Sequence, residues 1–186
     1  MLENWVVAPT CLPVVLRRCH ACASERFRAD GKFRVNAHHK LIDAWLLVLC
    51  TTCGETAKLT VFERTNVRSV RPELLARLHD NDLGLATELL QDPVLRRRNR
   101  IALDWTDAWR LDTGRSDHLD LDLDREVIDV AVRFAARIPV RPVRLVAEGC
   151  GLSRAEVERL IEEGNIVSAT RLTGKLSGDF TFTLKR

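Results

Sequence analysis

Four cysteines in two Cys-x-x-Cys pairs are the residues whose types and spacing point most directly to chemistry. The pairs are Cys19 with Cys22 and Cys50 with Cys53. Each pair presents two thiolates to one side of a tight turn, and together they supply a tetrahedral zinc site with sulfurs about 2.3 Å from the metal. The 27 residues from Ala23 to Leu49 suffice for a small β-meander that returns the second pair to the first. The spacing predicts a structural zinc ion (Zn²⁺) bound by all four cysteines.

Other uses of these cysteines stay open. A disulfide framework needs an oxidising compartment, whereas Met1–Trp5 lacks the start of a secretory signal, which favours a cytoplasmic protein. A redox pair is usually a single Cys-x-x-Cys that opens a helix, and here both pairs are expected at strand ends. Iron accepts the same four thiolates as zinc. Because a four-thiolate shell has no open position and no catalytic motif is found elsewhere, we do not expect an enzyme.

Composition and charge bound the class of protein. The 186 residues are 46% hydrophobic and 30% charged, which is typical of a folded globular chain, and no apolar run approaches the ~20 residues of a membrane span. Residues 1–70 carry 10 Lys and Arg against 6 Asp and Glu (+4), residues 71–130 carry 9 against 14 (−5), and residues 131–186 carry 10 against 6 (+4). Two basic ends around an acidic middle favour a polyanionic partner.

The elements that must position the cysteines are predicted to be strands in a zinc-ribbon-like β domain of residues 1–70. Strands are expected before each Cys-x-x-Cys, a Gly-containing turn at Ala29–Gly31, and a closing strand at Lys58–Arg64. Gly54, directly after the second pair, suits a turn that needs positive φ. The aromatic residues of this segment are expected in the core more often than on a base-stacking surface; they are Phe27, Phe33, Trp45 and Phe62.

The middle of the chain, residues 71–125, is predicted to be a helical and strand connecting region. Helices are expected to begin at Pro72, after an Asp82 cap and at Pro93, because Leu recurs at helical spacing. Residues 101–111, with two tryptophans, are expected to form a strand or loop. The basic run of residues 96–100 is interpreted either as a phosphate clamp or as a partner for an acidic strand at residues 119–124, which carries Asp120, Asp122 and Asp124.

The last segment, residues 126–186, is predicted to be a small module built on a helical hairpin. The pattern of residues 126–137 is ambiguous, and its β-branched content favours a strand. Val143–Glu148 predicts a first helix, and Ser153 with Glu156 forms a capping box for a second. Short strands follow at residues 165–168 and 180–184. The predicted fold class is therefore α+β, with an N-terminal four-cysteine zinc-ribbon β-sheet, a helical middle and a small C-terminal helical hairpin with short strands.

Leu152–Ile166 resembles the αL RNA-binding motif of ribosomal small-subunit protein four, although Val167–Thr170 replaces the motif's usual Val-Asn-Gly hairpin. The resemblance implies contact with structured RNA through five arginines, which are Arg141, Arg144, Arg154, Arg159 and Arg171. A DNA-binding helix-turn-helix and a hairpin used only for packing remain alternatives. The second helix also carries carboxylates unfavourable beside phosphate, namely Glu156, Glu158, Glu162 and Glu163.

The whole chain resembles a bacterial family catalogued as domain of unknown function 1062. The resemblance rests on Arg-Arg-Cys-x-x-Cys, on Gly31–Ala37 and Lys40–Leu46, on Cys-x-x-Cys-Gly, on Phe-Glu-Arg, and on Arg97–Arg100. It implies a zinc ribbon and no substrate. Two functions are carried forward: a zinc-stabilised RNA-binding protein that uses its basic ends, and a zinc-stabilised adaptor for a protein partner. Steep weakening of binding as salt rises would favour the first.

Overall fold

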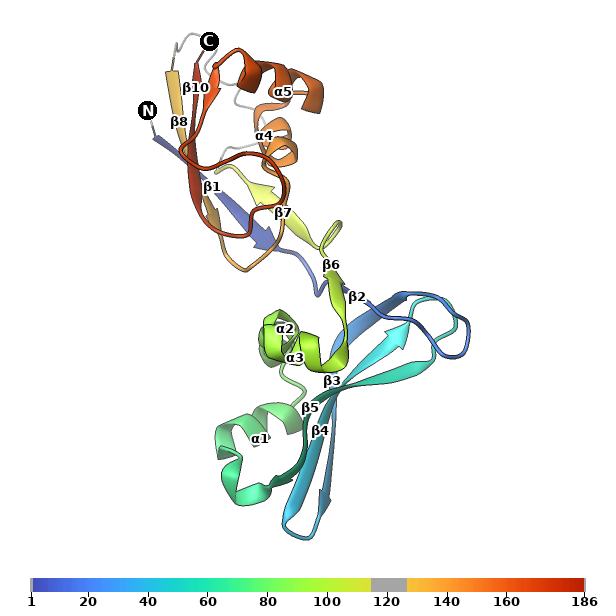
Figure 1. The fold of residues 1–186 in the computed structure, drawn as a ribbon. Helices are drawn as coiled ribbons and strands as arrows, with labels where there is room; N and C mark the ends of the chain where they lie inside the picture. The colour runs from blue at the N-terminus through green and yellow to red at the C-terminus, as the bar shows by residue number, and fades with distance from the viewer. Residues whose placement is uncertain (1, 115–126, 186) are drawn as a thin grey trace. The chain divides into compact units, whose positions relative to one another are not determined.

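The computed structural model describes residues 2–114 and 127–185, and the chain divides into two units (Figure 1). Residues 12–108 form one unit, here called the cysteine unit. Residues 1–11 combine with residues 109–186 in the other, here called the terminal unit. Each unit contains one five-stranded sheet with helices packed on it. The cysteine unit is thus inserted in sequence between the first strand of the terminal unit and the rest of that unit.

The sheet of the cysteine unit is antiparallel, in the order β5-β4-β3-β2-β6. Its strands are β2 (Val14–Leu16), β3 (Arg26–His38), β4 (Leu41–Cys50), β5 (Thr56–Asn66) and β6 (Ala102–Asp104). Burial alternates strictly along β4, where every even-numbered residue from Ile42 to Cys50 is buried and every odd-numbered residue is half-buried. This period of two gives the sheet an inward and an outward face.

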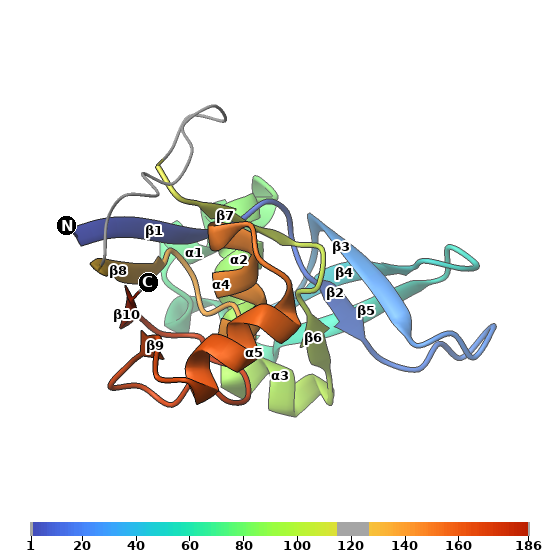
Figure 2. The same cartoon turned by 90° about the horizontal axis from the view of Figure 1, so that it is seen from above.

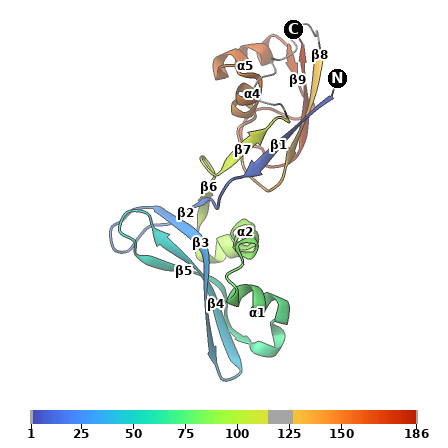
Figure 3. The ribbon, with the colours of Figure 1, turned by 180° about the vertical axis from the view of Figure 1, so that it is seen from behind.

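Three α-helices pack on the inward face of this sheet, as Figure 3 shows from behind. They are α1 (Pro72–His79), α2 (Leu83–Gln91) and α3 (Pro93–Asn99), and they follow a 3₁₀ turn at Val67–Ser69. The side chains of Asp82 and Asp92 accept backbone N–H groups at the starts of α2 and α3. Leu78, Leu90 and Leu95 are buried from the helix side, so the apolar faces of the helices complete the core.

The sheet of the terminal unit has the order β7-β1-β8-β10-β9, and these strands are labelled in Figure 2. They are β1 (Leu2–Pro9), β7 (Trp109–Asp112), β8 (Val127–Phe134), β9 (Ile166–Val167) and β10 (Phe180–Lys185). β1 runs parallel to β8, with Leu2 opposite Asp129, and antiparallel to β7, with Pro9 opposite Trp109. The two helices α4 (Pro142–Cys150) and α5 (Arg154–Glu162) lie on one face of this sheet.

Trp5 of β1 lies at the centre of the terminal unit. Its side chain is fully buried and meets Phe182 edge to face at 5.4 Å between ring centroids. It also lies directly against α4 at Gly149, where an added Cβ would overlap three ring atoms of Trp5. Gly149 therefore lets the helix approach the indole more closely than any other residue would permit.

The predicted architecture is wrong in its layout, although the N-terminal four-cysteine β-sheet is present. Strands dominate the described chain, and the predicted C-terminal helical hairpin, α4 and α5, is only part of a unit that is built on a five-stranded sheet. Its eight-residue β8 and six-residue β10 form a sheet with β1 from the other end of the chain. The helices of the middle segment, α1, α2 and α3, complete the core of the cysteine unit. Sheet partners more than 100 residues apart leave no local sequence signal.

Several local predictions are confirmed. Helices begin at Pro72 and Pro93, Asp82 caps α2, and the Ser153–Glu156 capping box opens α5. The ambiguous segment is the strand β8. The acidic strand predicted for residues 119–124 lies outside the described residues. Among the helices that are described, none combines the length and apolar character needed to cross a membrane.

Candidate metal centre

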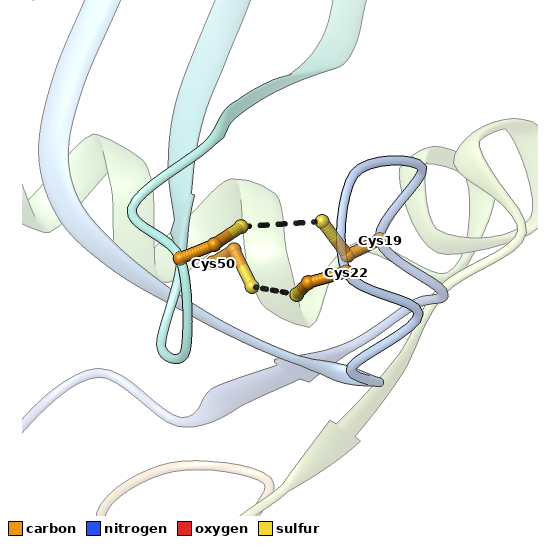
Figure 4. A group of neighbouring side chains, drawn as sticks. Cys19, Cys22 and Cys50 are labelled. Atoms are coloured by element: carbon orange, nitrogen blue, oxygen red, sulfur yellow. Dashed lines mark hydrogen bonds between the residues drawn. The ribbon is translucent and has the colours of Figure 1, made fainter.

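Two hairpin ends of the cysteine unit carry the two Cys-x-x-Cys pairs. Cys19 and Cys22 lie between β2 and β3. Cys50 is the last residue of β4, and Cys53 lies in the turn before β5. Both turns close in the same way: the Cys19 N–H donates to the Ser24 carbonyl at 2.7 Å, and the Cys50 N–H donates to the Glu55 carbonyl at 2.8 Å. The two turns are therefore copies of one backbone motif that present their thiols to each other (Figure 4).

The residue directly after each Cys-x-x-Cys has a left-handed backbone. Gly54 has φ of 75°, and Ala23, its counterpart after the first pair, has φ of 59°. Each donates its N–H to the carbonyl of the first cysteine of its turn, at 3.0 Å for Gly54 and 3.1 Å for Ala23. Glycine adopts this conformation without an energetic penalty, whereas alanine adopts it at a cost because of its Cβ. The sequence predicted this requirement at Gly54 and missed it at Ala23.

The four sulfur atoms lie at the separations that a tetrahedral thiolate site requires. Sγ of Cys19 is 3.7 Å from Sγ of Cys53, and Sγ of Cys22 is 3.5 Å from Sγ of Cys50 (dashed in Figure 4). All four sulfurs fall within 4.8 Å of one another, and none of the cysteines is in a disulfide. Four sulfurs at about 2.3 Å from one ion would be ~3.8 Å apart. The cluster can therefore hold a metal ion with little movement.

The cluster lies half inside the protein. Cys19 and Cys50 are buried and belong to the same core cluster as Val15, Phe27 and Leu90, whereas Cys22 and Cys53 are exposed. Two ligands are thus fixed by packing against the sheet and α2, and two lie on the turns at the surface. A metal ion bound here would join the turns to the hydrophobic core rather than lie apart from it.

The electrostatics of the cluster oppose the ionisation of all four thiols together. The backbone N–H of Cys53, with that of Thr52, lowers the pKa of Cys50 to about 6. The Glu55 N–H lowers the pKa of Cys53, but the neighbouring thiols of Cys22, Cys50 and Cys19 together with burial outweigh it and raise this pKa to about 12. One thiolate forms readily and suppresses ionisation of its neighbours. A divalent cation removes that conflict, because it binds thiolate rather than thiol.

The five arginines predicted to contact RNA all lie in the terminal unit, and four of them lie at the start of or within α4 and α5. Arg141 is the N-cap residue of α4, and the guanidinium of Arg144 stacks on the Trp109 ring at 5.0 Å. Arg154 opens α5, while Arg159 pairs with Glu163 at 3.4 Å, and Arg171 is exposed in the segment after β9. The stacking of Arg144 on Trp109 had no sequence signal, because these two residues are 35 positions apart.

The basic run of residues 96–100 has a structural role in the cysteine unit. Arg98 donates to the Val61 carbonyl at 3.0 Å, and the Asn99 side chain bonds both backbone groups of Thr60. These contacts cover the outer edge of β5, which otherwise presents unpaired peptide groups. The proposed ion pairs with Asp120, Asp122 and Asp124 involve residues outside the described chain.

Comparison with known proteins identifies a family. No curated protein and no solved structure matches the chain. The family described as "Protein of unknown function (DUF1062)" matches residues 35–172, a stretch that includes Cys50 and Cys53 and extends from β3 of the cysteine unit into the terminal unit. Since this match covers well over half of the sequence, the chain belongs to the DUF1062 family.

Proposed function

We propose that Cys19, Cys22, Cys50 and Cys53 bind one structural zinc ion. The observation that carries this proposal is the mutual approach of all four sulfurs within 4.8 Å at the ends of two matching turns. Four thiolates fill a tetrahedral shell, and they leave no position for an activated water, so we also propose that the site is not catalytic. A reducing compartment such as the cytoplasm keeps these thiols available for the metal.

Metal analysis of protein purified without chelator tests the first proposal. We expect one zinc per chain, and cobalt substituted for it should give the spectrum of a tetrahedral thiolate complex. Cys50→Ser should lose the metal and destabilise the cysteine unit, since binding energy of a structural site is folding energy. Cys11→Ser is the matched control, because Cys11 is an exposed cysteine outside the cluster. A folded protein without metal, or with iron in place of zinc, would contradict the proposal.

We further propose that the protein binds RNA through the arginines of the terminal unit. Support comes from the net charge of the last segment and from the placement of Arg141, Arg144 and Arg154 at the start of or within two short helices. Arg154 is informative because a cation in the first turn of a helix opposes the helix dipole. A residue that is unfavourable for the helix itself is more easily explained by an anionic partner.

Charge reversal with a matched control tests RNA binding. The double variant Arg141→Glu, Arg154→Glu should weaken binding of a labelled RNA hairpin more than about tenfold. The salt slope, which is the steepness with which log affinity falls as log salt concentration rises, should decrease by about one for each phosphate that the variant no longer neutralises. Arg110→Glu with Arg133→Glu is the control, because these exposed residues lie on β7 and β8, on the sheet face away from the helices. Equal weakening in both double variants, or none in the first, would favour the adaptor function, in which the partner is a protein.

A further inference from the structure

The outward face of the cysteine-unit sheet carries an aromatic and apolar stripe bordered by cations. Trp45, Leu47 and Leu49 alternate along β4 on the side opposite the buried residues, and all three are half-buried. The helices α1, α2 and α3 pack on the other face (Figures 1 and 3). Unlike Trp45, the side chains of Phe27, Phe33 and Phe62 point toward the face that the helices cover. Phe27 is buried there, and the other two pack against the core clusters. Trp45 is thus unlike the other aromatic residues of this sheet.

The orientation of the Trp45 ring is fixed by polar contacts rather than by the core. Its indole N–H donates to Glu63 at 3.1 Å, and the Thr60 hydroxyl donates to the same carboxylate oxygen at 3.3 Å. Lys58 places its ammonium group 4.9 Å from the centre of the ring. An indole held in this way keeps its ring system on the sheet surface at little entropic expense, as a stacking platform requires.

Three cations border this stripe from the neighbouring strands. Arg34 lies opposite Trp45 on β3, Arg28 lies opposite Leu49, and Lys58 lies opposite Leu47 on β5. In the part of the chain that the structure describes, none of the three forms an ion pair. Two carboxylates lie toward the β3–β4 turn and are both engaged as acceptors, Glu63 with Trp45 and Asp43 with the Arg64 backbone N–H. Asp30, which lies on β3 between Arg28 and Arg34, is paired with Lys32 at 3.6 Å. The net charge beside the stripe is therefore positive on the side toward the cysteines.

We propose that this surface, formed by Arg28, Arg34, Trp45, Leu47, Leu49 and Lys58, binds single-stranded nucleic acid. A base stacks on Trp45 as the Lys58 ammonium moves from the ring to a phosphate, and a second apolar contact forms with Leu47 or Leu49. Arg28 and Arg34 meet phosphates on the other side of β4. An aromatic ring on an open sheet with Arg and Lys along it is the combination that binds unpaired nucleotides with little sequence preference. A duplex hides its base faces and fits this surface less well.

The inference rests on the proposed function in one respect, because both take the ligand to be a nucleic acid. The residues differ, since the RNA-contacting arginines belong to the terminal unit and the Trp45 surface belongs to the cysteine unit. The two proposals therefore fail separately. If substitution of Arg141 and Arg154 weakens only the binding of an RNA hairpin, and substitution of Trp45 weakens only the binding of a single strand, each activity belongs to its own surface.

Fluorescence anisotropy with labelled 12-nucleotide oligothymidine tests the inference on the zinc-loaded, full chain. We expect Trp45→Leu, which keeps an apolar side chain without a stacking ring, to weaken binding between about 5-fold and 150-fold. Trp45→Phe, the conservative variant, should stay within about threefold. Arg34→Gln and Lys58→Gln should each reduce the salt slope by about 0.7, the value for one phosphate contact on a single strand. Zinc content and circular dichroism establish that the variants are folded.

Two results would overturn the inference. If oligothymidine does not bind at low salt, while an RNA hairpin binds and depends on Arg141 and Arg154, the Trp45 surface has no nucleic-acid role and the proposed function stands. If Trp45→Leu binds oligothymidine as tightly as the original protein while Lys58→Gln does not, the surface attracts polyanions without stacking. In that case a polyglutamate peptide should compete as well as the oligonucleotide, and the surface is an acidic-peptide site.

Discussion

Gly149→Ala is expected to destabilise the terminal unit, although alanine is normally the better helix residue. An added Cβ would lie well inside 3.0 Å of Trp5 ring atoms, and Trp5 is fully buried. Helix propensity alone favours alanine by about 1 kcal/mol, whereas overpacking a filled core costs about 1–3 kcal/mol and sometimes more. Because the overlap is with the ring itself, we expect the upper part of that range and a net loss of about 2 kcal/mol.

A double-mutant cycle distinguishes this contact from a general effect of the substitution. Trp5→Leu should cost about 2–4 kcal/mol through the cavity it leaves. In the double variant the new methyl group occupies part of that cavity, so Gly149→Ala should then cost far less or even stabilise. The expected coupling is about 1–3 kcal/mol, the range found for residues in direct contact. Gly178→Ala is the control, because its added Cβ meets nothing within 4 Å.

Unfolding in denaturant, with hydrogen exchange of β1 and β8 amides to assign the transition to the terminal unit, measures these free energies. Simple additivity of Gly149→Ala and Trp5→Leu would refute the reasoning, and so would a Gly149→Ala protein that is as stable as the original. Either result would mean that β1 does not pack against α4 in the way described.

Three further predictions concern the cysteine unit. Ala23→Gly should be neutral or stabilising by up to about 1 kcal/mol in thermal melts, because it relieves a left-handed backbone, and a clear loss would contradict this account. The hydrogen bonds from Arg77 lower the pKa of both Asp82 and Glu88. The stabilisation from these carboxylates is therefore fully present above their ordinary pKa values, and it is lost as the pH falls through their lowered pKa values in the folded protein. Urea midpoints should therefore drop on acidification, and Asp82→Asn should flatten this dependence. Removal of metal with a chelator should release amides of the cysteine unit to hydrogen exchange and leave those of the terminal unit protected, since each unit has its own sheet and buried side chains.

The cysteine cluster was predictable because its signal is local. Two Cys-x-x-Cys turns, with alternating strands on either side, leave few ways to place four thiols, and the sulfurs lie together as the spacing indicated. Helix starts were equally local, since Pro72, Asp82 and Pro93 act on the first turn alone. Ala23 could also have been identified, because it occupies the position after the first pair that Gly54 occupies after the second.

The arrangement of the sheets was not predictable in the same way. Residues 2–9 carry no sign that their partners are β7 and β8, because strand pairing depends on contacts between distant segments. The outward direction of Trp45 was also hidden, since its neighbours in sequence are as apolar as those of a core residue. The outward position of Trp45 became clear only from the alternation of burial along β4, in which the even-numbered residues point inward.

The parallel pairing of β1 with β8 has a consequence for synthesis of the protein. β1 leaves the ribosome about 125 residues before β8, so at ~5–20 residues per second it waits roughly 6–25 s for this partner. During that interval the whole cysteine unit emerges and can fold. Trp5 meanwhile has neither Phe182 nor α4 to cover it. Until β8 and α4 emerge, the nascent chain therefore carries an exposed aromatic strand, which is a target for chaperones.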